Sequence, residues 1–363
     1  MLYFWAFISA VIISFIFTAL IKQGAKRLNI FDDPQRAPER KIQPHPVPLL
    51  GGVAIYLTVI TVILFNLQDL LGGYLLDKHL WGLGLGGLVL IIGGILDDRY
   101  DLLPKYQLIF PSLAALIVVS CGIGINYITN PFGGIIALDQ WQWTVFNYQS
   151  IPYKVILLAD VFTVCWLMGM MYATKFLDGL DGLVSGITTI GSIIIFCLSL
   201  TQEVWQPETA LLGLIIAGAS LGFLILNFHP AKIYLGEGGS LLTGFLLGGL
   251  AIISGGKIAT ALLIMGLPLI DAAWVIFQRV FLDRQSPFKG DKKHLHFRLL
   301  DIGFSQQKTV LILYLITAVF GSTSLFLAGP QKLLSLGGLL VVVGGLSGYI
   351  YYKYRKHLTL KLK

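Results

Sequence analysis

Long apolar runs alternate with short polar segments along almost the whole chain of 363 residues. Each run is close to the roughly 20 residues that an α-helix needs to cross a hydrocarbon layer about 30 Å thick. Runs of this length favour helices, because every backbone N–H and C=O group inside a bilayer must be satisfied by the chain itself. The pattern therefore predicts an all-α integral membrane protein in which residues 1–363 form a single polytopic domain. We expect eleven membrane-spanning helices, at about 2–21, 47–67, 79–96, 106–126, 154–171, 183–201, 208–226, 239–255, 258–280, 309–328 and 333–352.

The composition excludes a soluble domain and gives no sign of a nucleic-acid partner. Charged residues make up only 12% of the chain and the mean hydropathy is +0.79, whereas about a quarter of the residues in a soluble protein are charged. Cys121, Cys165 and Cys197 all lie within apolar runs, where single cysteines are ordinary small core residues. We find no internal repeat, which disfavours a transporter built from two related halves.

The distribution of positive charge predicts the orientation of the chain. If the N-terminus is outside, the only Lys and Arg residues that fall outside are Lys78, Lys154, Lys257 and Lys332, out of 26. Basic residues concentrate in the cytoplasmic segments of membrane proteins. We therefore expect a multi-pass protein of the plasma (inner) membrane with its N-terminus outside and its C-terminus in the cytoplasm.

Two further features lie away from the cytoplasmic segments. The polar segment 127–153 is rich in aromatic residues, so we expect an interfacial loop with Trp141 and Trp143 at the depth of the lipid headgroups. Asp271 lies inside the ninth apolar run, and the simplest hypothesis is that it pairs with a nearby basic residue such as Arg279.

Side chains that could carry chemistry gather on the predicted cytoplasmic side. Clustered carboxylates with room for water suit Mg²⁺, which commonly shares its oxygen ligands with substrate phosphates. Lys, Arg and His side chains suit phosphate oxygens, and the apolar body would supply a groove for a lipid. We therefore expect an active site for phosphoryl transfer that faces the cytoplasm. The segments that would form it are 22–46, 97–105, 172–182, 227–238 and 281–308.

The segment 172–182 concentrates charge between two apolar runs. It contains Lys175, Asp178 and Asp181, and an ionisable side chain at membrane depth costs about 2.5–3.5 kcal/mol and marks a site or a pathway. If the segment is helical, two carboxylates three residues apart share one face, and they repel each other unless a cation, a donor or a ligand lies between them. The structural alternative is a short solvated turn between two helices.

Taken in order, the motifs resemble those of the polyprenyl-phosphate N-acetylhexosamine-1-phosphate transferases, and the resemblance extends over nearly the whole length. The run of three histidines that marks the pentapeptide-carrying branch is absent, so the chain is more similar to the sugar-phosphate branch. The motifs are Gly-Gly-x-Leu-Asp97-Asp98, Phe-x-Asp178-Gly-x-Asp181-Gly, Asn227-x-x-Pro-Ala, Gly236-x-x-Gly-Ser240 and His294-x-His296.

The resemblance implies transfer of N-acetylhexosamine 1-phosphate, with GlcNAc as the first choice of sugar, from a UDP-sugar to undecaprenyl phosphate. It further implies release of UMP, Mg²⁺ as cofactor and a role in cell-wall or surface-polysaccharide synthesis. The resemblance is also compatible with a homodimer. By motif, the catalytic residues would be Asp97, Asp98, His294 and His296. The substrate-binding residues would be Lys41, Lys175, Asp178, Asp181, Asn227 and Arg298, and the metal ligands Glu237 and Asp98.

Two departures from the family pattern fall at positions that resemble metal ligands. The family pattern has Asn where this chain has Lys175 and Asp where it has Glu237. At 4 Å and an effective dielectric constant near 20, a lysine would repel each unit of positive charge on a cation by about 4 kcal/mol.

Two hypotheses remain open from these departures. In the first, the metal shifts toward Asp98, Asp178 or Glu237, and Lys175 contacts the pyrophosphate. In the second, Lys175 pairs with Glu237 and occupies the place of the metal. The second hypothesis leaves a metal-independent enzyme, or an inactive or regulatory relative that binds prenyl phosphate or a nucleotide sugar.

Overall fold

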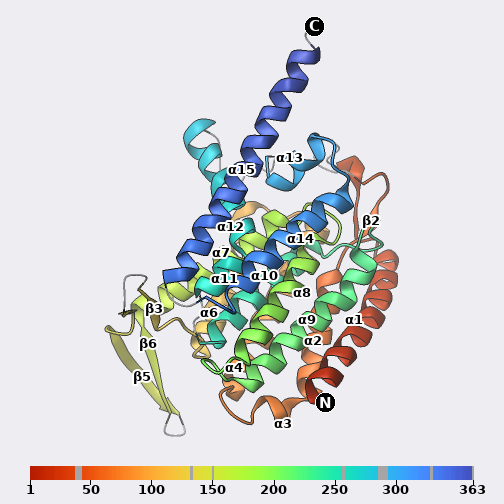
Figure 1. The fold of residues 1–363 in the computed structure, drawn as a ribbon. Coiled ribbons are helices and arrows are strands. Elements are labelled where there is room, and N and C mark those ends of the chain that lie inside the picture. The colour runs from red at the N-terminus through yellow and green to blue at the C-terminus, as the bar shows by residue number, and fades with distance from the viewer. Residues whose placement is uncertain are drawn as a thin grey trace.

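The computed structural model describes residues 1–36, 43–130, 134–148, 151–255, 258–284, 293–327 and 330–361. Each apolar run of the sequence contains a helix, which confirms the prediction of an all-α membrane protein (Figure 1). The longer helices are α1 (Leu2–Arg27), α2 (Gly51–Phe65), α4 (Asp77–Tyr100), α6 (Ile109–Ser120), α7 (Leu157–Leu177), α8 (Leu183–Ser199), α9 (Pro207–Asn227), α10 (Gly236–Ile253), α12 (Gly266–Phe277), α14 (Gln306–Thr323) and α15 (Pro330–Lys361). The short ones are α3 (Leu67–Leu70), α5 (Pro104–Gln107), α11 (Ile258–Ile264) and α13 (Leu295–Asp301), with a 3₁₀ turn η1 (Pro34–Arg36) and a π-helical turn η2 (Gln278–Leu282).

Six helices of the described chain are long and apolar enough to cross a membrane, namely α1, α4, α7, α9, α10 and α15. The pair Ile258–Ile264 and Gly266–Leu282, bent by 77°, makes a seventh if it counts as one broken span. The apolar helices Gly51–Phe65, Pro104–Ser120 and Leu183–Ser199 are shorter. The chain is thus a multi-pass membrane protein, while the number of eleven spans and the orientation stay predictions.

The strands form three small antiparallel pairs. The segment 127–153, expected to be an interfacial loop, is instead largely paired into hairpins that project from the bundle (Figure 1). Aromatic and β-branched residues fit a pleated ribbon, and Trp143 lies opposite Val155 in it. The pairs are β1 (Phe31–Asp32) with β2 (Val47–Pro48), β3 (Tyr127–Thr129) with β4 (Ile135–Ala137), and β5 (Gln142–Tyr148) with β6 (Ile151–Ile156).

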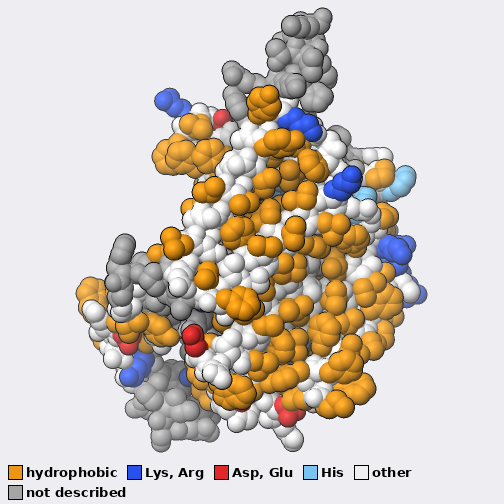
Figure 2. All heavy atoms as spheres, in the orientation of Figure 1, with side chains coloured by type: hydrophobic (Ala, Val, Ile, Leu, Met, Phe, Trp, Pro, Cys, Tyr) orange, Lys and Arg blue, Asp and Glu red, His pale blue; other side chains and the backbone are white. Residues whose placement is uncertain are grey.

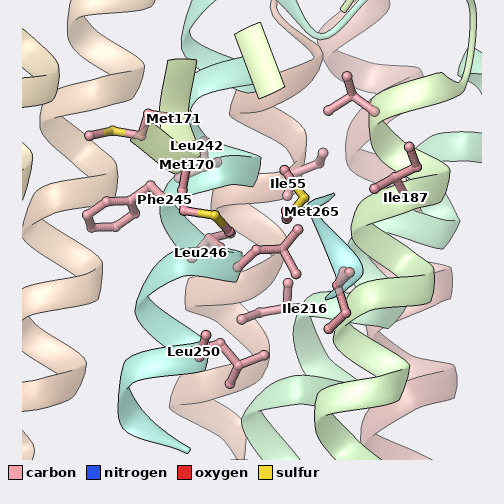
Figure 3. Close-up of a cluster of buried hydrophobic side chains, with 14 of the residues drawn as sticks. Ile55, Met170, Met171, Ile187, Ile216, Leu242, Phe245, Leu246, Leu250 and Met265 are labelled. Carbon is pink, nitrogen blue, oxygen red and sulfur yellow. The ribbon is translucent and has the colours of Figure 1, made fainter. Parts of the chain in front are cut away.

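Helix α10 is the centre of the bundle. It packs against α7, α4, α2 and α8, and all its residues except Glu237 are buried. Phe245, Leu246 and Leu250 of this helix meet Met170 and Ile216 from two neighbouring helices in the core shown in Figure 3. Because α10 is enclosed by protein, its N-terminus is held at a fixed place at one end of the bundle.

Glycines allow the backbones of α4 and α2 to approach the first turn of α10. A Cβ atom on Gly94 would overlap the backbone of Gly238, and one on Gly52 would overlap the backbone of Gly239. The Gly52 N–H also donates to the carbonyl oxygen of Leu235 at 2.8 Å. These contacts leave no room for side chains, so the end of α4 lies directly against the start of α10.

The outer surface of the bundle is apolar. Hydrophobic side chains cover most of the face seen in Figure 2, and most of the Lys, Arg and His side chains on that face lie toward the end that carries α13 and β2. Exposed large residues such as Leu64, Leu315 and Val341 belong to this surface. In water such a surface would be an aggregation hazard, and it suits contact with lipid.

The Gly94–Gly238 contact leads to a stability prediction. We expect Gly94→Ala to lower the free energy of unfolding by about 1–3 kcal/mol. The added methyl group would overlap backbone atoms of Gly238, which cannot move aside as a side chain can by changing its rotamer. Gly84→Ala in the same helix is the matched control, since its nearest neighbour is a side-chain atom of Ile60 at 3.5 Å. Thermal unfolding of the purified protein in detergent would measure both. Equal effects of the two substitutions would contradict the close packing of α4 on α10.

Candidate active site at the end of the helix bundle

A cavity of about 490 Å³ opens where the loops of the bundle meet β2 and α13. Each of the five segments singled out in the sequence contributes to its lining. The polar lining residues are Asp32, Gln43, His45, Asp98, Lys175, Asp178, Asp181, Asn227, His229, Tyr234, Glu237, Ser240 and Gln306. Val47, Leu49, Leu180 and Phe297 supply apolar walls. A cavity lined by both charged and apolar side chains can hold a ligand that carries both charged and apolar groups.

Asp98 joins the end of α4 to the start of α10. Its Oδ1 accepts the backbone N–H of Glu237 at 3.0 Å, so a carboxylate caps a helix N-terminus where backbone N–H groups favour negative charge. Gly236 has φ of +74°, and a Cβ atom there would overlap Asp98 Oδ2. The glycine of the Gly236-x-x-Gly-Ser240 motif is therefore required for the contact that positions Asp98.

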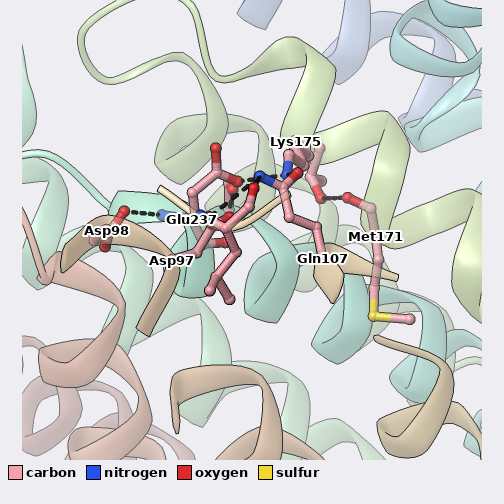
Figure 4. A network of polar contacts seen from close by, with 9 residues as sticks. Asp97, Asp98, Gln107, Met171, Lys175 and Glu237 are labelled. Atoms are coloured by element: carbon pink, nitrogen blue, oxygen red, sulfur yellow. Dashed lines mark hydrogen bonds and ion pairs between the residues drawn. The ribbon is translucent and has the colours of Figure 1, made fainter. Parts of the chain in front are cut away.

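Lys175 links α7 to the other side of the same turn. Its Nζ lies 2.8 Å from Oε2 of Glu237 and donates to Oε1 of Gln107 at 3.0 Å (Figure 4). The side chains of Lys175 and Glu237 are 16% and 37% exposed, and both line the cavity. The pairing of Lys175 with Glu237 that the second sequence hypothesis requires is therefore present in the structure.

Asp97 lies on another side of α4 from its neighbour Asp98. Its Oδ1 accepts the backbone N–H of Leu102 at 2.9 Å and the side-chain amide of Gln107 at 3.1 Å. The side chain is nearly buried and is absent from the cavity lining. Of the two adjacent aspartates, the structure directs Asp98 into the cavity and uses Asp97 to hold the turn that follows α4.

Asp178 and Asp181 both line the cavity but differ in their surroundings. Asp181 Oδ2 lies 2.7 Å from Nδ1 of His229 and accepts the backbone N–H of Ala231 at 3.0 Å. The carboxylate of Asp178 is open to the cavity, and no hydrogen bond joins it to any residue described in the structure. Desolvation by the enclosing protein, followed by the carboxylates of Glu237 and other acids, raises the pKa of Asp178 well above its ordinary value. A positively charged ligand next to Asp178 would favour the ionised carboxylate and lower this pKa.

Asn227 supports the loops more than it faces a ligand. Its Oδ1 accepts the backbone N–H of Gly182 at 3.1 Å and the hydroxyl of Ser185 at 2.9 Å, and its Nδ2 donates to the carbonyl oxygen of Ile233 at 2.9 Å. Both ends of the amide are thus engaged by protein. The residue fixes the loop after α9 against the loop after α7.

The two motif histidines lie beneath the cavity and do not line it. Nδ1 of His294 lies 2.8 Å from Oδ2 of Asp271, whose Oδ1 accepts the backbone N–H of Leu295 at 2.8 Å. The His296 ring stacks on the His294 ring and is packed so closely under Gly179 that a Cβ atom there would overlap Nε2. His296 is 1% exposed, neither ring nitrogen has a hydrogen-bond partner among the described residues, and burial lowers its pKa to about 3.

The remaining predicted site residues are placed as follows. Arg298 donates to Oε1 of Gln278 at 3.0 Å and is absent from the cavity lining. Lys41 lies outside the described residues. Asp271 has His294 as a partner, where the sequence hypothesis named basic residues such as Arg279.

Several cavity residues are not among the site residues predicted from the sequence. Asp32 lines the cavity and accepts the amide of Gln43 at 2.6 Å. His229 and Tyr234 line it as well. Burial and the carboxylate of Asp181 raise the pKa of Tyr234, so its hydroxyl keeps its proton. The signal available for His229 and Tyr234 was their place within the same polar loop as Asn227.

The donor set does not match a magnesium site. Among the described residues, no group of three or more His, Cys, Asp or Glu side chains converges as metal ligands. Glu237 faces an ammonium group, and Asp98 is engaged by a backbone N–H. Mg²⁺ requires near-octahedral oxygen ligands, and a fixed cation within hydrogen-bond distance of one would-be ligand opposes its binding.

Comparisons with known proteins agree with the ordered motifs. A family model described as glycosyl transferase family 4 matches residues 80–255. The chain is 29% identical to the probable undecaprenyl-phosphate N-acetylglucosaminyl 1-phosphate transferase of Bacillus subtilis, over 93% of this chain and 88% of the relative. It is 31% identical to the decaprenyl-phosphate N-acetylglucosaminephosphotransferase of Mycolicibacterium smegmatis, over 93% and 85%. It is also 28% identical to the phospho-N-acetylmuramoyl-pentapeptide-transferase of Shouchella clausii, over 89% and 95%.

The neutral His296 leads to a prediction about pH. Its folded-state pKa of about 3 lies below the ordinary 6.5 of an unfolded chain, so the unfolded state takes up the proton first as the pH falls. Above pH 6.5 the neutral ring contributes fully to the free energy of unfolding. This contribution is lost progressively between pH 6.5 and 3, and the loss is about 2 kcal/mol at pH 5. Thermal unfolding of wild type and His296→Gln between pH 7 and 5 would measure this contribution, with His45→Gln, an exposed histidine, as control. An unchanged pH slope in His296→Gln would contradict a buried, neutral His296.

Proposed function

This chain belongs to glycosyl transferase family 4, and from that premise we propose that it transfers N-acetylglucosamine 1-phosphate from UDP-GlcNAc to undecaprenyl phosphate. Two relatives support this substrate class, since they are named for N-acetylglucosamine phosphate transfer to undecaprenyl or decaprenyl phosphate and align with this chain over most of its length. We also propose that the cavity faces the cytoplasm, where UDP-sugars are made, because most basic residues belong to that side of the predicted topology.

The observation that carries the proposal is the mixed lining of the cavity. The apolar side chains of Val47, Leu49 and Phe297 suit the first isoprene units of a lipid, and the ammonium group of Lys175 suits phosphate oxygens. The cavity lies at one end of the helix bundle, and we propose that the phosphate of a membrane lipid enters it there. A volume of about 490 Å³ falls within the usual range of small-ligand pockets.

The proposed reaction takes place at phosphorus. An oxygen of the lipid phosphate attacks the β-phosphorus of the UDP-sugar, the phosphorus that carries the hexosamine. The bond between this phosphorus and the bridging oxygen breaks, and UMP leaves with that oxygen and its electron pair. The products are a lipid-linked pyrophosphoryl sugar and UMP, and the bond between the sugar and its phosphate is kept.

Each charged group has a proposed role in this transfer. Asp98, at the contact between α4 and α10, would act as the general base. It would accept the proton of a lipid phosphate that arrives as a monoanion, since the second pKa of a phosphate monoester is about 6. Asp178 and Asp181 would shape the nucleotide pocket. Lys175 would contact the diphosphate, whose charge must be stabilised in the transition state.

Other motif residues would position these groups. Asp97 holds the turn after α4, and Asn227 holds the loops after α7 and α9. His294 and His296 support the segment that carries Asp178 from below. We propose that they affect the reaction through that segment and do not contact the reacting atoms.

A second candidate function is favoured by the Lys175–Glu237 ion pair. A chain whose metal position is filled by a lysine could have lost catalysis and still bind prenyl phosphate or a nucleotide sugar as a regulator of an active relative. The two candidates differ in one measurable property, which is the release of UMP.

The test is UMP release by the purified protein with undecaprenyl phosphate and UDP-GlcNAc. We expect turnover in wild type, and we expect Asp98→Asn to reduce kcat by about 10²- to 10⁴-fold, the usual effect of removing a general base. Asp101→Asn is the matched control, because Asp101 follows the same helix but is exposed and absent from the cavity lining. No UMP release from folded wild-type protein would favour the regulatory alternative. An equal loss in both variants would contradict the role of Asp98.

A further inference from the structure

Lys175 is held at the cavity wall by two side chains from different parts of the chain. The Nζ atom of Lys175 lies 2.8 Å from Oε2 of Glu237 in α10, with which it forms an ion pair, and it donates a hydrogen bond to Oε1 of Gln107, at the end of α5, at 3.0 Å. Gln107 is itself fixed, because its amide nitrogen Nε2 donates to Oδ1 of Asp97 at 3.1 Å and to the carbonyl oxygen of Leu102 at 3.0 Å. The ammonium group is therefore positioned by a chain of bonds that begins at the buried Asp97.

The surroundings of this ammonium group are those of a cation site. Carboxylates of Asp98, Asp178 and Glu237 line the same cavity, and the Lys175 side chain is only 16% exposed. An ammonium group has three N–H donors. One donates to Gln107, and the positive charge is paired with Glu237. Donor capacity therefore remains for a ligand oxygen, since Gln107 is the one hydrogen-bond acceptor of this ammonium group among the residues described in the structure.

We propose that Lys175 is the resident cation of this site and that its ammonium group, in place of a divalent ion, binds the diphosphate of the nucleotide sugar. This inference rests on the proposed function for the identity of the ligand. When the diphosphate enters, its oxygens accept a hydrogen bond from the Lys175 ammonium group, while Glu237 and Gln107 hold that ammonium group in position. Binding of the nucleotide sugar then needs no added metal.

The disagreement between the donor set and a magnesium site supports this assignment. A divalent ion bound to Glu237 would lie next to the ammonium group and be repelled by it. Removing Lys175 would relieve that repulsion and leave Glu237, Asp98 and Asp178 as oxygen donors facing one cavity. The proposal therefore predicts an exchange, in which loss of the lysine creates a requirement for metal.

The experiment measures binding of UDP-GlcNAc to the purified full chain by calorimetry, in EDTA and in excess Mg²⁺. The variants are Lys175→Asn, the double variant Lys175→Asn with Glu237→Asp, and Lys232→Asn. Lys232 is the matched control, because it is an exposed lysine in the loop between α9 and α10 and does not line the cavity. Thermal unfolding reports whether each variant is folded.

We expect the Kd of wild type to differ by less than about threefold between EDTA and Mg²⁺. In Lys175→Asn, binding in EDTA should weaken by about tenfold or more. The double variant should bind UDP-GlcNAc weakly in EDTA, and Mg²⁺ should restore its affinity. Lys232→Asn should behave as wild type. If Lys175→Asn fails to fold, Lys175→Gln tests the same charge, because its amide can still donate to Glu237.

Two results would overturn the proposal and leave the transferase function standing. The first is a wild type that binds UDP-GlcNAc at least tenfold more weakly in EDTA than in Mg²⁺. The second is an unchanged Kd in EDTA for a folded Lys175→Asn or Lys175→Gln variant. Folded wild type that binds no UDP-GlcNAc under either condition would overturn the proposed function as well.

Discussion

The contact between the end of α4 and the start of α10 determines the geometry of the candidate site. Gly94 and Gly238 bring the two backbones together, and Asp98 accepts the N–H of Glu237 across the join. Helix α10 is enclosed by four others, so this end of it has little freedom to move. The cavity residues of α4 and α10 therefore keep their relative positions without help from a ligand.

The polar groups around this contact form connected networks at the end of an otherwise apolar bundle. One runs from Asp97 through Gln107 and Lys175 to Glu237. Another joins the loops after α7 and α9 through Asn227, and the Asp181–His229 pair lies between the same two loops. Partly buried polar groups are costly unless they are satisfied. Asp97 and Asn227 thus serve to hold the cavity-facing groups in place.

The sequence predicted the helices and the segments that meet at the cavity, because the length of an apolar run and the cost of burying charge are local properties. It did not predict which of Asp97 and Asp98 faces the cavity. Adjacent residues on a helix point about 100° apart, and the choice depends on where α10 packs. The positions of His294 and His296 beneath the segment 178–182 depend in the same way on tertiary packing. The hairpins of the segment 127–153 were missed because aromatic residues suit both an interface and a strand.

The two departures from the family pattern are explained by one interaction. Lysine in place of asparagine would leave a poorly solvated ammonium group beside the cavity, and glutamate in place of aspartate would move a carboxylate by one methylene. Together they place a carboxylate oxygen 2.8 Å from the ammonium nitrogen, and Gln107 accepts a hydrogen bond from the same ammonium group. A partly buried ion pair is stable only when both partners are present. Lys175 and Glu237 are therefore best understood as a single unit, in which a positive charge at the cavity wall belongs to a side chain of the protein.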